Sequence, residues 1–166
     1  LALYRGELYA GGSMESAGGT GVLFIARWNG SEWRSVGDGT DGVVRDFTVS
    51  GDRLIVVGDF ITVGGLPAGH LATWDGASWG TIGGGLDGSV RSVFEDAEGN
   101  IFVGGDFGAS ADAIAHRVSK WDGTAWRALG EGIEGTGHAV AAGHGGVYVG
   151  GAFTVAGGAL ANGIAF

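Results

Sequence analysis

A pair of tryptophans five residues apart occurs three times, and this repetition constrains the fold more than any other feature of the sequence. The first members of the pairs are Trp28, Trp74 and Trp121, so successive pairs are 46 and 47 residues apart. All six tryptophans of the chain belong to these pairs. Because self-similarity at a fixed period of roughly 20–50 residues is typical of repeat architectures, we interpret the chain as an array of repeats.

The glycine content indicates which kind of repeat this is. Glycine accounts for 38 of 166 residues, whereas 45% of the residues are hydrophobic and only one is proline. Disordered chains combine low hydrophobicity with high charge, so this composition favours short strands joined by tight turns. Apolar residues show no convincing helical spacing. The segment Ser110–His116 is the nearest exception, and we expect at most a single helical turn there.

Alignment on the tryptophans brings four expected strands of each repeat into register. An apolar first strand is expected at residues 1–4, 43–49, 90–94 and 139–142. A second strand that ends in glycine is expected at residues 8–12, 54–58, 101–105 and 147–151. A longer loop then leads to a third and a fourth strand, which carry the two tryptophans. Four antiparallel strands per repeat are typical of a propeller blade, so we predict an all-β fold, a β-propeller of four-stranded antiparallel blades.

The tryptophan pairs themselves are predicted to be hairpins. Asn29-Gly30, Asp75-Gly76 and Asp122-Gly123 are dipeptides that favour tight turns between antiparallel strands. The two tryptophans of a pair, such as Trp28 and Trp33, would then face each other across the two strands. We therefore favour a packing role for the pair over a ligand-binding role.

The repeats are expected to form one domain with units 1–46, 47–93, 94–139 and 140–166. The chain holds about 3.6 repeats of 46–47 residues, and we expect the last unit to lack its fourth strand. The sequence also opens within a repeat, so we expect a piece of a longer protein whose upstream signal is missing. Because unpaired strand edges favour pairing with other chains, we predict self-association. Closure as four blades and a two-fold dimer of eight blades are the alternatives.

The order of these features resembles a known family. Gly104-Gly105 and Gly150-Gly151 match the diglycine after the second strand of kelch-type propellers of the galactose-oxidase-like superfamily, and Trp33, Trp79 and Trp126 match their outer tryptophan. The fuller pattern resembles repeat arrays in secreted bacterial surface proteins and in the ectodomain of a fungal polarity protein. This resemblance covers essentially the whole chain and implies a propeller at an extracellular or cell-surface location. It implies no activity, since a fold does not determine a function.

Charge and cysteine content exclude several classes of partner and chemistry. The net charge is −9, which argues against nucleic acid and anionic membranes, because both attract clustered Lys and Arg. No apolar run approaches the roughly 18 residues of a membrane span, so we expect no membrane insertion. The absence of cysteine excludes disulfides and thiolate metal sites. It also excludes the cysteine–tyrosine cross-link on which the copper-radical oxidation of the superfamily's best-known enzyme depends.

The motif Gly37–Gly42 has the G-x-G-x-x-G spacing of a dinucleotide site, which requires a following helix. It recurs at residues 83–88 and 130–135, each time between a tryptophan strand and an apolar first strand. We interpret the three copies as links between blades and predict no cofactor. Calcium is an alternative because these loops carry carboxylates, but the carboxylates belong to different repeats and no Asp-x-Asp-x-Asp-Gly loop exists. Solvated acidic turns are the favoured interpretation.

The predicted strand order places the links and the longer loops, at residues 13–21, 61–69 and 108–117, on one face. Function usually lies on long loops that a rigid scaffold presents. The candidate ligand-binding residues on this face are Asp38, Asp41, Asp59, Asp87, Asp112, His116, Arg117, Glu131 and Glu134.

The predicted function is a non-catalytic scaffold of a secreted or cell-surface protein that binds a protein or carbohydrate ligand in adhesion, recognition or assembly. No histidine motif and no G-x-S-x-G supports an enzyme. Two alternatives remain open. One is an extracellular glycan-active hydrolase or lyase that uses acidic residues of the same face, and the other is a self-associating fragment with no other activity.

Overall fold

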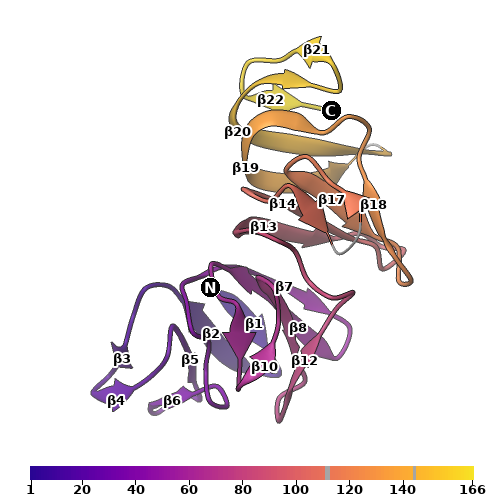
Figure 1. Ribbon diagram of the computed structural model, residues 1–166. Coiled ribbons are helices and arrows are strands. Elements are labelled where there is room, and N and C mark those ends of the chain that lie inside the picture. Colours follow the sequence, from indigo (N-terminus) through magenta and orange to yellow (C-terminus); the bar gives the residue numbers. More distant parts are fainter. Residues whose placement is uncertain (111–112, 144) are drawn as a thin grey trace.

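The computed structural model describes residues 1–110, 113–143 and 145–166, and every regular element within these ranges is a β-strand. The strands form successive antiparallel sheets along the chain, from the indigo end to the yellow end of Figure 1. The predicted all-β class with four-stranded antiparallel sheets is therefore confirmed.

Three sheets have the same strand order: their four strands lie side by side in the order in which they occur along the chain. The first sheet contains β1 (Ala2–Tyr4), β2 (Glu7–Gly11), β5 (Ile25–Trp28) and β6 (Trp33–Ser35). The second sheet contains β7 (Val44–Ser50), β8 (Arg53–Gly58), β11 (Leu71–Trp74) and β12 (Trp79–Thr81). The third sheet contains β13 (Val90–Glu95), β14 (Ile101–Gly105), β17 (Val118–Trp121) and β18 (Trp126–Ala128).

The fourth sheet begins with two long strands, β19 (Ile133–Gly143) and β20 (Gly146–Ala156). The third strand β22 (Ile164–Ala165) pairs with the middle of β20, and β21 (Ala159–Leu160) pairs with its end. Within residues 1–110, 113–143 and 145–166, no strand pairs with the outer side of β22. The boundaries of the predicted repeat units fall inside β7, β13 and β19, so each unit boundary divides the first strand of a sheet.

The segments that we expected to be longer loops contain small β-hairpins. They are β3 (Ser16–Ala17) with β4 (Thr20–Gly21), β9 (Thr62–Val63) with β10 (Leu66–Pro67), and β15 (Ala109–Ser110) with β16 (Ala113–Ile114). The helical turn expected at Ser110–His116 is wrong for the described residues of this segment, and residues 111 and 112 lie outside them. Cα pairing of Ala109 with Ile114 and of Ser110 with Ala113 makes this segment the counterpart of the β9–β10 hairpin.

The glycine at the end of each second strand has a specific structural reason. A Cβ atom at Gly58 or Gly105 would collide with the carbonyl oxygen just before the neighbouring first strand, and one at Gly151 with the carbonyl oxygen of Thr136 within β19. At each of these places the pairing register of the two strands also shifts, as in a β-bulge. Only glycine allows the two backbones to approach this closely, and the glycine at the end of the expected strand therefore marks the bulge.

The tryptophans of each pair face each other across a tight hairpin, as predicted. The Cα pairs are Trp28 with Trp33, Trp74 with Trp79, and Trp121 with Trp126, and ring centroids lie 5.6, 5.0 and 5.5 Å apart. The first turn residue fixes the turn, because its Oδ1 accepts hydrogen bonds from the backbone amides two and three residues later. Asn29, Asp75 and Asp122 all have this role.

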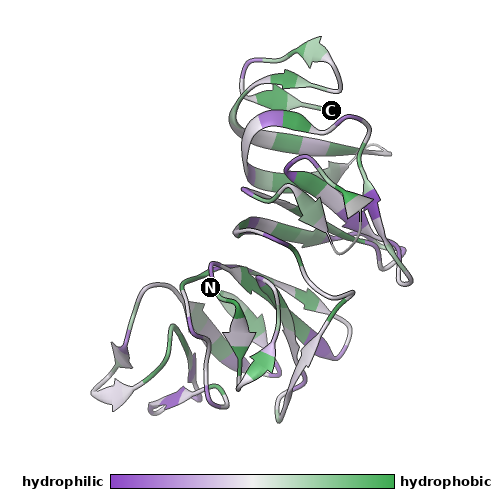
Figure 2. Cartoon of the chain, viewed as in Figure 1, coloured by the Kyte–Doolittle hydropathy of each residue, from purple (hydrophilic) through white to green (hydrophobic). Residues whose placement is uncertain are grey.

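Consecutive sheets pack face to face and share a core. The first strand β13 contacts both β7 and β19, whereas the first and last sheets lie at opposite ends of the array in Figure 1. One apolar cluster joins the first and second sheets, another joins the second and third, and a smaller one joins the third and fourth. Along β8, Val56 faces the first sheet and Ile55 the third, as the two-residue period of a strand requires. Figure 2 shows the hydrophobic residues mainly along the strands.

Candidate functional site

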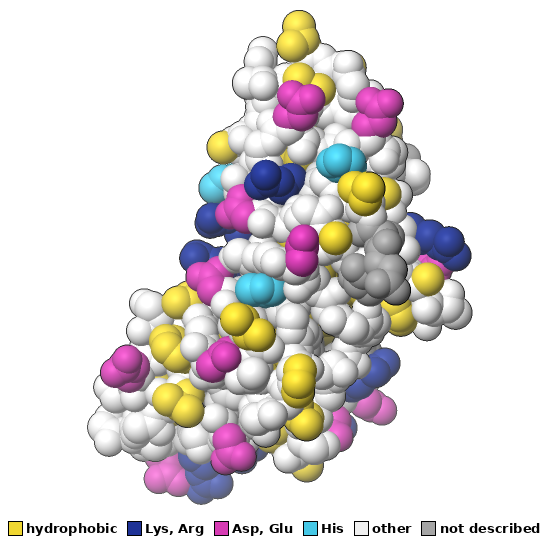
Figure 3. All heavy atoms as spheres, in the orientation of Figure 1, with side chains coloured by type: hydrophobic (Ala, Val, Ile, Leu, Met, Phe, Trp, Pro, Cys, Tyr) yellow, Lys and Arg dark blue, Asp and Glu magenta, His cyan; other side chains and the backbone are white. Residues whose placement is uncertain are grey.

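The links between sheets and the small hairpins form one surface, which we call the loop face. Each link lies against the hairpin of the following sheet. Isolated bridges join Thr40 to Val63 and Leu86 to Ser110. This arrangement confirms the expectation that the links and the long segments open on the same side. Figure 3 shows that acidic and exposed apolar side chains are scattered over one side of the molecule.

Two of the candidate acids are structural caps. Oδ1 of Asp41 accepts hydrogen bonds from the amides of Ile61 and Thr62, at 2.7 and 2.9 Å. Oδ1 of Asp87 accepts the same pair of bonds from Gly108 and Ala109, at 2.8 and 2.9 Å. Partial burial raises the pKa of Asp41, but the hydrogen bonds from Thr62 and Ile61 outweigh it and hold this pKa below its usual value. Each aspartate therefore fastens a link to the next hairpin.

A third candidate acid belongs to a polar network that connects neighbouring sheets. Asp59 pairs with Arg45 of its own sheet, with an N–O distance of 2.5 Å, and accepts a hydrogen bond from the hydroxyl of Ser89 in the following link. Burial raises the pKa of Asp59, but the bonds from Arg45 and Ser89 hold it below its usual value. A side chain with these partners is not available to act as a free base.

The same network recurs one sheet later, around Asp106. Arg91 lies 2.7 Å from Oδ2 of Asp106, and Thr136 donates to Oδ1 at 2.5 Å. The candidate Arg117 also approaches Oδ1, at 3.5 Å. Asp106, Arg45 and Arg91 were not among the predicted residues. The recurring Gly-Asp-Phe after the second strand, at residues 58–60 and 105–107, was the sequence signal that could have identified this position.

Three other candidates line one groove of the loop face. His116, Glu131 and Glu134 line a groove of about 490 Å³ together with Gly130, Gly132, Ile133, Val155 and other residues of the hairpins and the link. His116, Glu131 and Glu134 are exposed, and so is Ile114, whose side chain is 68% exposed. The groove combines two carboxylates, an imidazole and an apolar side chain, which suits recognition of a ligand with hydrogen-bonding and apolar parts.

A backbone feature explains the position of His116. Its φ is +42°, and the corresponding residue in the second sheet is Gly69, with a φ of +51°. The carbonyl oxygen of His116 accepts a hydrogen bond from Ile133, at 3.1 Å, just as that of Gly69 accepts one from Leu86, at 2.8 Å. A left-handed conformation is costly for histidine and is often found at functional positions. This conformation places an imidazole at the groove where the second sheet has no side chain.

A smaller groove lies beside the corresponding link, between that link and the hairpin of the first sheet. It has a volume of about 240 Å³, and Asp38, Leu23 and Ser35 are among the residues that line it. Asp38 occupies the position of Glu131, and Leu23 that of His116. The groove is therefore a recurring feature of the loop face, and its side chains differ from one junction to the next.

The candidate residues do not converge on one centre. Asp41, Asp59 and Asp87 serve different links, and Asp38 lies in another groove than Glu131. Asp112 lies outside the described residues. Among residues 1–110, 113–143 and 145–166, no group of three or more His, Asp or Glu side chains is close enough to hold a metal ion. Within these residues the candidate side chains are therefore distributed over separate links and grooves of the loop face.

In comparisons with known proteins, no family model matches the chain and no curated protein matches it. Within the described residues, the structure contains no helix long and apolar enough to cross a membrane.

Proposed function

We propose that the four sheets are blades of a β-propeller, and that this propeller is a non-catalytic recognition scaffold of a secreted or cell-surface protein. Three observations support the propeller: the first three sheets share strand order, consecutive sheets pack face to face, and the last two junctions use the same polar connection. The order of glycines and tryptophans resembles that of kelch-type propellers. The proposed secreted or cell-surface location rests on the similar repeat arrays of surface proteins.

The recognition role is supported by a difference among the acidic residues: some are bound by the scaffold and others are exposed in a groove. Asp41, Asp59 and Asp87 are held by amides, an arginine or a hydroxyl of the scaffold itself. Glu131 and Glu134, in contrast, are exposed beside His116 and Ile114 in the groove of the loop face. A rigid frame with side chains that vary between equivalent grooves is the usual design of a binding module.

The ligand that this groove fits is a protein segment or a carbohydrate with neutral or basic groups. Its carboxylates accept hydrogen bonds from hydroxyl or ammonium groups, and Ile114 offers an apolar contact. The net charge of −9 disfavours an acidic ligand, because like charges across an interface weaken association.

Binding to glycan and peptide arrays tests this function. We expect bound ligands whose signal falls in the variants Glu131→Gln and His116→Asn, the second of which keeps a residue that tolerates positive φ. The matched control is Glu98→Gln, which changes an exposed carboxylate outside the loop face. Binding that is equal in all four proteins, or turnover of a bound polysaccharide, would contradict the proposal.

Self-association is a second function that a specific observation favours. Apolar side chains are exposed at both ends of the array: Leu1 and Leu3 on the first sheet are 85% and 70% exposed, and Leu160 and Phe166 on the fourth are 91% and 74% exposed. Such surfaces commonly mark protein–protein contacts. We expect light scattering to give a mass above that of one chain, and Leu3→Ser together with Leu160→Ser to lower it. A monomer at all concentrations would contradict this role.

A further inference from the structure

The second tryptophan of a pair lies between two glycines that come from different parts of the fold. In the second sheet, a Cβ at Gly37, in the preceding link, would lie 2.9 Å from Nε1 of Trp79. A Cβ at Gly64, in the hairpin of the same sheet, would lie 2.8 Å from Cδ1 of the same indole. Both glycines are therefore needed for the indole to fit, and both have positive φ.

Each half of this arrangement recurs in a neighbouring sheet. In the third sheet, Trp126 lies against Gly83 of the preceding link, and its Nε1 donates to the carbonyl oxygen of Gly83 at 3.1 Å. A Cβ at Gly83 would lie 2.6 Å from that nitrogen. In the first sheet, a Cβ at the hairpin glycine Gly18 would lie 2.9 Å from Cδ1 of Trp33. A link glycine and a hairpin glycine thus provide the space for the indole of the second tryptophan.

The fourth sheet has both glycines, and a cavity lies between them. Gly130 takes the place of Gly37 and Gly83, and Gly157 takes the place of Gly64. Their φ values, +58° and +56°, match those of their counterparts. A Cβ at either glycine would meet no described atom within 4 Å. The cavity has a volume of about 580 Å³, and its other walls are mainly apolar side chains, among them Val118, Leu129, Ile133, Val149 and Phe166.

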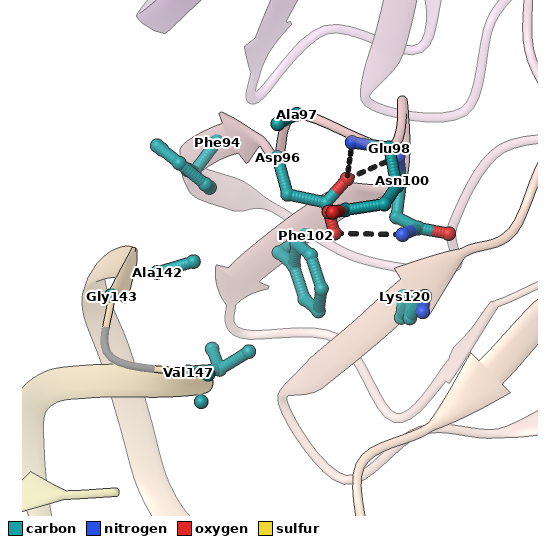
Figure 4. A pocket seen from close by; sticks show the side chains of 12 residues that line it. Phe94, Asp96, Ala97, Glu98, Asn100, Phe102, Lys120, Ala142, Gly143 and Val147 are labelled. Atoms are coloured by element: carbon teal, nitrogen blue, oxygen red, sulfur yellow. Dashed lines mark hydrogen bonds between the residues drawn. The ribbon is translucent and has the colours of Figure 1, made fainter.

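A second pocket lies where the first tryptophan of a pair belongs. In the first sheet, the β2 residue Tyr9 accepts a hydrogen bond from Nε1 of Trp74, at 3.3 Å, across the junction with the second sheet. Phe102 is the β14 residue in the same position. Figure 4 shows its ring in a pocket of about 600 Å³ between the third and fourth sheets, near Lys120 and Val147. The two pockets together correspond to the places that one tryptophan hairpin fills at the earlier junctions.

We propose that the cavity between Gly130 and Gly157 is a tryptophan socket, and that its occupant is a further copy of the Trp-x-Gly-x-x-Trp hairpin. The fourth strand of that hairpin would pair with β22 and complete the fourth sheet. In the third sheet Ser119 pairs with Ala128, and Ala165 of β22 corresponds to Ser119. The occupant therefore places a small residue opposite Ala165 and its second tryptophan two residues earlier, above Gly130. This proposal does not depend on ligand binding at the loop face.

Fusion of the hairpin to the chain tests the socket directly. The fusion carries the sequence of residues 121–129, Trp-Asp-Gly-Thr-Ala-Trp-Arg-Ala-Leu, directly after Phe166. We expect a higher melting temperature than that of the unextended chain, because two indoles become buried. Replacement of the second tryptophan of the fused segment by alanine should remove most of the gain. Equal melting temperatures of the two fusions would overturn the proposal.

Substitution of the socket glycines provides the structural control. Gly130→Ala and Gly157→Ala should lower the melting temperature of the fusion more than that of the unextended chain, because the added Cβ meets the indole only in the fusion. Gly6→Ala is the matched control, since Gly6 has a φ of +77° and no atom within 4 Å of its Cβ position. It should affect both chains equally. Equal effects of all three substitutions in the two chains would also overturn the proposal.

A free peptide tests binding from a separate molecule. Fluorescence anisotropy of the labelled nine-residue peptide should show binding to the unextended chain, with affinity about tenfold weaker for the peptide whose second tryptophan is alanine. Gly130→Ala should weaken binding, whereas Gly6→Ala should not. Failure of the array experiment leaves this prediction unchanged, so the two proposals can fail separately. Equal affinity of the two peptides would count against the socket.

Discussion

The hydroxyl of Thr136 donates a hydrogen bond to Oδ1 of Asp106 across the junction between the fourth and third sheets, at 2.5 Å. The other oxygen of Asp106 contacts Arg91, at 2.7 Å, so one carboxylate connects the first strands of two sheets. Asp59 makes the same connection between Arg45 and Ser89. Because the bonds are charge-assisted, these two junctions are held by polar contacts as well as by their apolar cores.

Removal of the charge at Asp106 should loosen this junction. Asp106→Asn keeps the shape of the side chain but weakens its bonds to Arg91 and Thr136. The side chain of Asp106 is only 28% exposed, so we expect a loss of about 1–3 kcal/mol in the free energy of unfolding. Urea unfolding followed by tryptophan fluorescence measures this loss. Glu98→Gln, at an exposed turn, should leave the midpoint unchanged, and an equal midpoint for Asp106→Asn would contradict the assigned role.

Acid should destabilise the fold over a defined pH range. Burial raises the pKa values of Asp59 and Asp106, but hydrogen bonds to their partners outweigh it and leave both below the usual value. Bonds from the amides of Ser78 and Ala77 lower the pKa of Asp75 to about 2. An unfolded aspartate has a pKa of about 3.9, so the unfolded state binds protons first as the pH falls.

The stabilising contribution of these aspartates is therefore complete above about pH 4 and is lost as the pH falls toward 2. Urea midpoints at pH 7, 4, 3 and 2 measure the loss. Asp106→Asn should lose less stability than the wild type between pH 4 and pH 2. A flat profile below pH 4 would contradict the low pKa values.

Loss of a tryptophan at a junction between sheets should lower the free energy of unfolding more than loss of one at the end of the array. Trp74 is 3% exposed between the first and second sheets and donates to Tyr9, whereas Trp28 is only half-buried. We expect Trp74→Ala to cost about 3–5 kcal/mol and Trp28→Ala distinctly less. The two variants form a matched pair because both remove the first tryptophan of a hairpin. Equal losses in thermal and urea unfolding would show that burial at the junction does not set the cost.

Substitution of Gly85 should lower the stability strongly, because the link that contains it lies close to the backbone of the preceding hairpin segment. Its φ is +79°, and a Cβ there would lie 2.7 Å from the carbonyl oxygens of Ala68 and Gly69. Gly51 also has positive φ, +53°, but its Cβ position is open. Gly51→Ala should cost about 1 kcal/mol through backbone strain, and Gly85→Ala more, because the link must move away from the hairpin. Similar melting temperatures for the two variants would contradict the prediction that the close backbone contact adds to the cost at Gly85.

Residues that repeat with the period were predictable from the sequence. The facing tryptophans, the glycine-terminated second strands and the position of the links all depend on local chemistry that occurs three or four times, so alignment within the chain exposed them. The hairpins β9–β10 and β15–β16 were missed because strands of two residues carry too little periodicity to be recognised. The helical turn expected at Ser110–His116 failed for the same reason.

The individual roles of the acidic residues could not be predicted. Asp41 and Asp38 lie in the same short link and have the same chemistry, yet Asp41 caps Ile61 and Asp38 lines a groove. The difference depends on which backbone amides point at each carboxylate, and this is decided by tertiary packing between segments about 20 residues apart. Similarly, Asp59 meets Ser89 only because consecutive sheets pack with their first strands side by side.

The position of β13 between the first strands of the two neighbouring sheets, β7 and β19, has a consequence for how such a molecule loses its structure. Stability in a linear array is a sum of terms for each unit and each interface, and cooperativity extends only as far as these interfaces are strong. Because the apolar cluster between the third and fourth sheets is the smallest, opening should begin there and proceed one sheet at a time. Duplication or deletion of a whole unit would replace one interface by an almost identical one, so lineages with this design can vary in length without redesign of the core.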